Sequence, residues 1–151
     1  LRNVGSGKYL NVHNGVDANT TNVYQWTADG TIEQNFRLEY KSNGTYHIRA
    51  MCSSNGTNRV LDIVKSGGVV ASGCNVEIYN PTDPVAQEWL FYDMGNGMYK
   101  IVPASNTSVA LTSYGSSNGS SGGQTSTSAG NVFVSTYTGN TNQLWILEPV
   151  P

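Results

Sequence analysis

Three segments of the chain share one pattern, and this pattern decides the fold. Residues 22–36 read NVYQWTADGTIEQNF, residues 75–89 read NVEIYNPTDPVAQEW, and residues 131–145 read NVFVSTYTGNTNQLW. Each segment begins with Asn-Val and ends with Gln-x-aromatic. The second begins 53 residues after the first (75 − 22), and the third 56 residues after the second (131 − 75). A pattern that keeps its internal spacing in three copies indicates three structural repeats.

A shorter apolar run precedes each segment, at residues 10–12, 61–63 and 110–112. Similar short runs recur along the chain, separated by Gly, Asn, Ser and Thr, which are unfavourable inside helices. These runs lie at residues 8–12, 46–49, 60–63, 76–79, 98–102 and 132–134. Many short strands separated by turn residues predict an all-β sandwich or barrel.

The repeats divide the 151 residues into three units, approximately 1–45, 46–97 and 98–151. A unit of about 50 residues of strands is too small to bury its own apolar face, so repeats of this kind share one core. We therefore expect residues 1–151 to form a single domain around a pseudo-threefold axis.

The order Asn-Val-x-x-aromatic followed by Gln-x-Trp resembles the ricin B-chain-type lectins and the family-13 carbohydrate-binding modules. The resemblance covers essentially the whole chain. It implies a β-trefoil, which is a six-stranded barrel capped by three hairpins, with up to one sugar site in each repeat. Phe36, Trp89 and Trp145 are expected to be core anchors, since large aromatic side chains supply much of the buried area in a small core. The three glutamines are expected to hold the sugar loop or the sugar itself.

The second repeat has the most complete set of residues at the positions that the resemblance implies for a sugar. Asp62 stands at the acidic position, Tyr79 at the stacking aromatic and Gln87 at the amide before the core Trp. Glu77 stands where Gln is usual, and Ala86 replaces an Asn. A sugar ring offers an apolar face to an aromatic ring, and hydroxyls that carboxylates and amides bind well. Asp62 as the cap of a turn, and Tyr79 as a partly buried strand residue, stay open as alternatives.

The first repeat keeps Trp26 and Gln34 but has Asn11, Tyr24 and Glu33 where Asp, Gln and Asn are usual. The resemblance therefore implies a weaker site here, or one for a modified ligand. Trp26 as a partly buried strand residue is the alternative.

In the third repeat, Leu111 is aligned with the Asp and Ser135 with the aromatic residue, and only Asn142 and Gln143 remain. We expect this pocket to be lost.

Charged residues make up 12% of the chain and the net charge is −2. With no cluster of Lys or Arg, a nucleic-acid partner is not expected. No apolar run approaches the roughly 20 residues that span a bilayer, so no membrane partner is expected either. The abrupt start at Leu1 and the surface rich in Asn, Ser, Thr and Gly favour a mature, secreted piece of a larger protein.

The two cysteines, Cys52 and Cys74, fit no metal-ligand spacing. One disulfide between them is our hypothesis, with two free thiols as the alternative. No metal or cofactor is expected.

Together with these residues, the resemblance implies a monomeric, non-catalytic carbohydrate-binding module, appended to a secreted glycoside hydrolase. The expected ligands are galactose- or arabinose-containing chains (galactan, arabinogalactan) or xylan. The alternative is a trefoil that binds proteins, such as a protease inhibitor or a toxin or receptor-binding lectin subunit. An enzyme ranks third, because no repeat carries two acids at facing catalytic positions.

Overall fold

The computed structural model describes residues 1–53, 56–122 and 124–150. These residues form twelve short β-strands, three 3-10 turns and one helical turn. The strands are β1 (Arg2–Asn3), β2 (Tyr9–Val12), β3 (Thr21–Trp26), β4 (Phe36–Tyr40), β5 (Tyr46–Ala50), β6 (Val60–Ile63), β7 (Val76–Tyr79), β8 (Trp89–Asp93), β9 (Met98–Pro103), β10 (Val109–Ser113), β11 (Val132–Thr136) and β12 (Trp145–Ile146). The turns are η1 (His13–Gly15), η2 (Ile32–Gln34) and η3 (Thr141–Gln143), and the helical turn is α1 (Pro84–Gln87).

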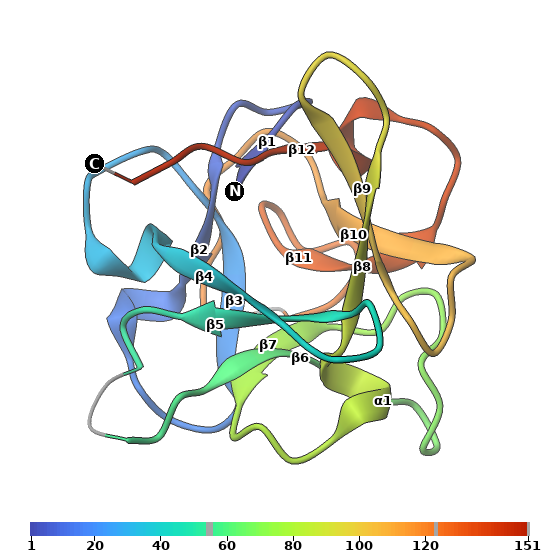
Figure 1. Ribbon diagram of the computed structural model, residues 1–151. Coiled ribbons are helices and arrows are strands. Elements are labelled where there is room, and N and C mark those ends of the chain that lie inside the picture. The colour runs from blue at the N-terminus through green and yellow to red at the C-terminus, as the bar shows by residue number, and fades with distance from the viewer. Residues whose placement is uncertain (54–55, 123, 151) are drawn as a thin grey trace.

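Each sequence unit contributes four strands, and the strands have the same two roles in every unit. The first and fourth build a barrel, in which antiparallel ladders join β4 to β5, β5 to β8, β8 to β9, β9 to β12 and β12 to β1. The second and third pair as the hairpins β2–β3, β6–β7 and β10–β11. This is the β-trefoil that the sequence predicted. Figure 1 shows the three units following one another around the molecule, from blue through green to red.

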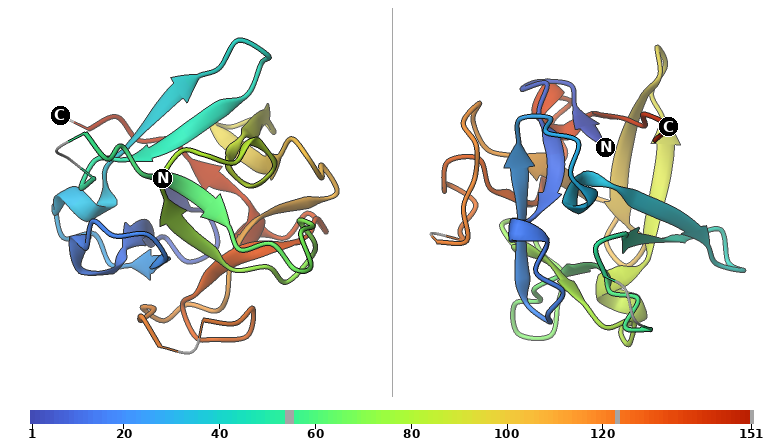
Figure 2. Two further views of the ribbon diagram at one scale, coloured as in Figure 1. Left: turned by 90° about the horizontal axis from the view of Figure 1, so that it is seen from below. Right: turned by 90° about the vertical axis from the view of Figure 1, so that its left-hand side faces the viewer.

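The two termini lie on the same side of the barrel, because β1 pairs with β12 (Figure 2). Between β10 and β11, the described residues on either side of position 123 project from the body in both views of Figure 2. No helix in the described residues is long and apolar enough to cross a membrane.

The core repeats as the sequence does. Leu10, Leu61 and Leu111 are fully buried at equivalent positions of the three hairpins. Trp89 and Trp145 are also fully buried, and their indole nitrogens donate to the carbonyls of Leu61 (3.2 Å) and Leu111 (2.9 Å). These two tryptophans are therefore confirmed as core anchors.

Phe36 departs from that prediction. It packs against the core but is only partly buried, and it lines an open pocket beside Leu1 and Leu38. A phenyl ring is smaller than an indole and has no N–H group, so Phe36 has no hydrogen bond of the kind that anchors the two tryptophans.

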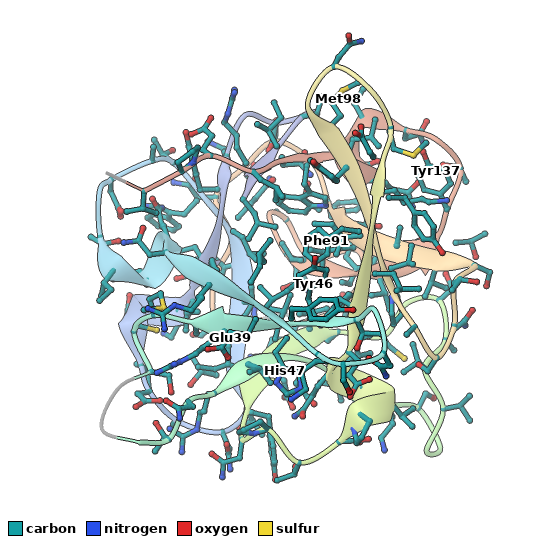
Figure 3. All side chains as sticks on the ribbon, in the orientation of Figure 1. Glu39, Tyr46, His47, Phe91, Met98 and Tyr137 are labelled. Atoms are coloured by element: carbon teal, nitrogen blue, oxygen red, sulfur yellow. The ribbon has the colours of Figure 1, made fainter. Side chains whose placement is uncertain are left out.

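Aromatic rings form a row near the turns that join β4 to β5 and β8 to β9. Tyr46 and Phe91 meet edge to face with their centroids 5.5 Å apart (Figure 3). Tyr40 and Tyr99 extend the row on either side. Edge-to-face contacts are a favourable geometry for aromatic rings, so this row helps to hold the β4–β5 and β8–β9 strand pairs together.

The disulfide hypothesis is wrong, because both cysteines are free thiols. They lie at different junctions between repeats. The carbonyl of Cys74 accepts a hydrogen bond from Val134 of β11. Cys52 comes directly after Met51, which follows the last residue of β5. Its pKa is raised to about 11, mainly by burial and next by the charge of Asp17 in the first repeat. Each thiol packs separately against the core.

The asparagines that open the three repeated segments form a closed hydrogen-bonded ring. Asn22 Nδ2 donates to Asn131 Oδ1 (3.1 Å), Asn131 Nδ2 to Asn75 Oδ1 (2.8 Å), and Asn75 Nδ2 to Asn22 Oδ1 (3.0 Å). One amide from each repeat therefore satisfies the next, which places the ring on the pseudo-threefold axis. Buried amides need such partners, and this explains why Asn stands at the same place in every repeat.

The ring gives a stability prediction. Asn131 is 2% exposed, and Asn131→Ala would remove its bonds to both other asparagines and to the Thr125 carbonyl. We expect the free energy of unfolding to fall by roughly 2 kcal/mol, because buried polar groups lose their partners. Urea unfolding followed by tryptophan fluorescence measures this. The control is Asn140→Ala, since Asn140 is exposed and makes no side-chain cap. Equal stability of the two variants would contradict the role of the ring.

Candidate functional site

The hairpin β6–β7 brings together most of the residues predicted for the second repeat. Its register places Asp62 opposite Glu77 and Val60 opposite Tyr79. Side chains alternate along a strand, so Glu77 and Tyr79 lie on one face, with Asp62 beside Glu77. The three side chains line an open pocket of about 390 Å³. The pocket is completed by Ile63, Val64, Lys65, Gly68, Thr82 and Asp83.

The two carboxyl groups in this pocket share a hydrogen bond. Asp62 is 7% exposed and Glu77 is half-buried. Burial, followed by the hydrogen bond to Asp62 and its charge, raises the pKa of Glu77 to about 8. Burial also raises the pKa of Asp62, against the opposing effect of hydrogen bonds from Glu77 and Gln87. At neutral pH the pair therefore holds one proton, with Glu77 donating and Asp62 accepting.

Gln87 is fully buried and lies behind the pocket rather than in its lining. Its Oε1 accepts hydrogen bonds from the backbone N–H groups of Thr82 and Asp83, and its Nε2 donates to the Asn80 carbonyl at 2.7 Å. It also lies near Asp62 and opposes the rise in the pKa of that acid. Gln87 therefore positions the loop that follows Tyr79 and lies behind the acid.

The other two repeats use their glutamines in the same way. Gln34 donates from Nε2 to the Thr27 carbonyl and accepts at Oε1 from the N–H of Asp29. Gln143 likewise donates to the Thr136 carbonyl and accepts from the N–H of Thr138. Both glutamines are buried. The glutamines were expected to hold either the sugar loop or the sugar itself, and these contacts show that they hold the loop.

Lys65 and Asp83 belong to the second-repeat pocket but were missed by the sequence analysis. Lys65 Nζ lies 2.6 Å from Asp83 Oδ2, and Asp83 also accepts a hydrogen bond from the N–H of Val85 at the start of α1. The Lys65 ammonium holds the pKa of Asp83 below its usual range. The order Asp83-Pro84 is typical of a helix start and signals the cap. No sequence signal places Lys65 at the pocket.

The first repeat also forms a pocket, smaller than that of the second. Asn11 lies opposite Tyr24 in the β2–β3 register, as Asp62 lies opposite Glu77 in β6–β7. The pocket has a volume of about 110 Å³ and is lined by Asn11, Asn14, Tyr24, Trp26, Asp29 and Glu33. Three of the four residues predicted here are therefore brought together, and Gln34 lies behind them.

In the third repeat, the register corrects the alignment by one residue. Leu111 pairs with Val134, and its carbonyl accepts the Trp145 indole N–H as the Leu61 carbonyl accepts that of Trp89. Leu111 is therefore the counterpart of Leu61, a core residue. The counterpart of Asp62 is Thr112, which pairs with Phe133 and donates to the Ala110 carbonyl. An acid is missing at this position, as expected, although Leu111 is not the residue that replaces it.

Comparisons with known proteins agree with the fold. A sequence family described as ricin-type beta-trefoil lectin domain-like matches residues 1–79. No curated protein sequence matches the chain significantly.

Three solved structures illustrate the likeness. The designed threefold-symmetric protein ThreeFoil is 28% identical with a TM-score of 0.80, over 99% of this chain and 96% of its own. The exo-beta-1,3-galactanase 1,3Gal43A from Clostridium thermocellum is 26% identical with a TM-score of 0.79, over 99% of this chain and 29% of its own. The ricin B-like lectin of Macrolepiota procera, solved with lactose, is 15% identical with a TM-score of 0.69, over 96% of this chain and 89% of its own.

Proposed function

Because this chain belongs to the ricin-type β-trefoil lectin domain-like family, we propose that it is a carbohydrate-binding domain whose main site is the pocket of the second repeat. The observation that carries the proposal is the gathering of Asp62, Glu77 and Tyr79 around one open pocket. An acceptor, a donor and an aromatic ring in one pocket match the two surfaces of a sugar ring.

Each side chain has a defined task in this proposal. The ionised Asp62 accepts hydrogen bonds from two adjacent sugar hydroxyls, and bonds to a charged acceptor are the stronger kind. Tyr79 stacks on the apolar face of the sugar. Glu77, through its proton, keeps Asp62 oriented and ionised, while the buried Gln87 holds the same acid from behind.

The proposed ligands are galactose- or arabinose-containing chains such as galactan or arabinogalactan, with xylan as the next candidate. A ring with an axial hydroxyl leaves one face broadly apolar, which suits stacking on Tyr79. The similarity to part of an exo-beta-1,3-galactanase supports beta-1,3-linked galactan as the first probe. The likeness covers only 29% of that enzyme. This fits our proposal that the chain is a monomeric module carried by a secreted glycoside hydrolase.

We propose further that the domain itself is not catalytic. Glycosidases hold their two carboxyl groups roughly 5 to 9.5 Å apart, so that the glycosidic bond, with or without a water, fits between them. Asp62 and Glu77 are hydrogen-bonded to each other instead. A pair in direct contact leaves no room for a bond to be cleaved.

Electrophoresis in gels containing dissolved polysaccharide tests the proposal. We expect the protein to be retarded by galactan or arabinogalactan, and less by xylan. Several weak sites engaging one polymer strengthen the retention. Binding to none of the three polymers would contradict the proposed function. Release of reducing sugar that one acid variant abolishes would contradict the absence of catalysis.

The raised pKa of Glu77 gives a prediction about how stability and sugar binding depend on pH. The pKa of Glu77 is raised from 4.5 to about 8 in the folded protein. The folded state therefore holds more protons than the unfolded chain between these two values, and stability falls as the pH rises through this window. Above it, the carboxylates repel each other and Asp62 loses its donor. We expect sugar affinity to fall by roughly tenfold, the value of one hydrogen bond to a charged group.

Glu77→Gln is the matched control, because an amide donates at every pH. The variant is expected to bind equally below and above pH 8, and to be more stable than the wild type by an amount that grows as the pH rises from 4.5 to about 8. Calorimetric titration and urea unfolding across the pH range measure the two effects. If the sugar affinity of the wild type does not change with pH and equals that of Glu77→Gln throughout, the proton on Glu77 has no role in binding.

A further inference from the structure

The first-repeat pocket differs from the second in its charge and in its donors, and we infer that it binds a positively charged amino sugar. This inference rests on the proposed function, that the chain binds sugars. It adds the chemical class of the ligand at a second pocket.

A buried polar group of the first-repeat pocket is an acceptor without a donor. Asn11 is 3% exposed, and its Nδ2 donates to the Val12 carbonyl at 3.1 Å. Its Oδ1 is buried and has no hydrogen-bond partner among the described residues. A buried acceptor left unpaired costs free energy, so a ligand that brings a donor to this oxygen recovers that cost.

Two carboxylates, Asp29 and Glu33, form the rim of the same pocket. Within the described parts of the chain, neither has an ion-pair partner, whereas Asp83 in the second pocket is paired with Lys65. Burial raises the pKa of Tyr24 against the effect of the Asn14 backbone, and the charges of Glu33 and Asp29 raise it further, so both carboxylates act on this residue of the pocket lining.

Two basic side chains lie near the pocket without lining it. Lys8 Nζ donates to Thr27 Oγ1 at 3.1 Å, and His13 Nδ1 lies 3.0 Å from the Tyr24 hydroxyl. Both are held by these partners. The lining itself therefore contains two negative side chains and no positive one.

An ammonium group fits the acceptors and negative charges of this pocket better than a hydroxyl does. A hydroxyl both donates and accepts, but an ammonium only donates and offers three N–H groups. Acceptors of Asn11, Asp29 and Glu33 line this pocket beside the rings of Trp26 and Tyr24, and the oxygen of Asp29 that binds Thr31 leaves its second carboxylate oxygen for a ligand. A cation is also attracted to the face of an aromatic ring. A protonated amino sugar supplies the cation and, through its ring, a surface for Trp26.

The experiment uses nuclear magnetic resonance and follows the Trp26 indole signal in an Asp62→Ala background, which silences the second pocket. The chain has three tryptophans, and the other two are fully buried, so a Trp26→Tyr variant assigns the signal. The probes are galactosamine, N-acetylgalactosamine and galactose, at a mildly acid pH where the free amine is protonated. We expect galactosamine to bind about tenfold more tightly than the other two. High salt should reduce the preference, since it screens charges at a partly exposed site.

The Asp29→Asn/Glu33→Gln double variant should lose the preference and keep the weaker binding of the neutral sugars. Asp93→Asn is the charge control, because Asp93 lies in the β8–β9 hairpin away from the pocket. Equal binding of all three probes at Trp26 would overturn the inference and leave the proposed function standing. A Trp26 response to ammonium or calcium chloride as large as that to galactosamine would also overturn it, and would identify a general cation site. If neither pocket binds any sugar, the proposed function fails and the inference fails with it.

Discussion

Replacing Asp62 with alanine is expected to weaken the binding of a galactose-containing oligosaccharide to the isolated domain by at least about tenfold. A hydrogen bond to a charged group contributes roughly 1.5–3 kcal/mol, and two sugar hydroxyls would lose their acceptor. Folding should survive, because burial raises the pKa of Asp62 and the acid is therefore not stabilised in its ionised form by the fold. Titration calorimetry measures the affinity, and urea unfolding checks the fold.

The matched control is Thr112→Ala at the equivalent position of the third repeat. Thr112 is 3% exposed and its hydroxyl donates to the backbone of its own strand, so its loss should leave affinity unchanged. If Asp62→Ala binds as the wild type does while Trp26→Ala loses all binding, the main site lies in the first repeat and our ranking of the repeats is wrong.

The second large effect concerns the core. Trp89→Ala is expected to lower the free energy of unfolding by about 3–5 kcal/mol, because it removes a fully buried indole and leaves a cavity. Trp89→Phe should cost less, roughly 1–3 kcal/mol, since it keeps most of the ring and loses the hydrogen bond to the Leu61 carbonyl. Urea unfolding followed by circular dichroism compares the variants.

Phe36→Ala is the internal comparison for this prediction. Phe36 occupies the same place in the first repeat but is only partly buried. Its removal should therefore cost less than the removal of Trp89. A loss for Trp89→Ala that does not exceed the loss for Phe36→Ala would show that the anchoring role of the Gln-x-aromatic residue has been misread.

The fold was predictable because its determinants repeat in the sequence. The Asn-Val pairs lie within one residue of the start of β3, β7 and β11, and the asparagines meet in one ring. The Gln-x-Trp pairs mark a loop glutamine and a core tryptophan in each of two repeats. Three copies in register constrain the topology in a way that a single copy does not.

The predictions failed where they depended on the pairing of strands or on distances between side chains, which the sequence does not give. The loop between β10 and β11 is longer than the loops between β2 and β3 and between β6 and β7, so the sequence pattern placed Leu111 where Thr112 stands. Cys52 and Cys74 lie at different places in the fold and have different neighbours, which their spacing in the sequence does not show. Lys65 reaches the pocket through the loop that follows β6, and no periodicity predicts that contact.

The site residues were predictable as a set, but their roles were not. Glu77 and Gln87 were both expected to supply polar contacts to a sugar. The structure instead places Gln87 behind Asp62 and gives Glu77 a shared proton with that acid. Both roles depend on burial and on side-chain contacts across strands.

The central claim, that the second-repeat pocket binds carbohydrate, is tested most directly by a titration followed in two-dimensional amide spectra. The isotope-labelled domain is titrated with a beta-1,3-linked galactose oligosaccharide. We predict that the signals that move belong to residues 62–65, 77–79 and 82–83 around the pocket. Spectra that do not change at a saturating concentration of galactose-, arabinose- or xylose-based oligosaccharides would contradict the claim, as would changes confined to the barrel end formed by β4–β5 and β8–β9.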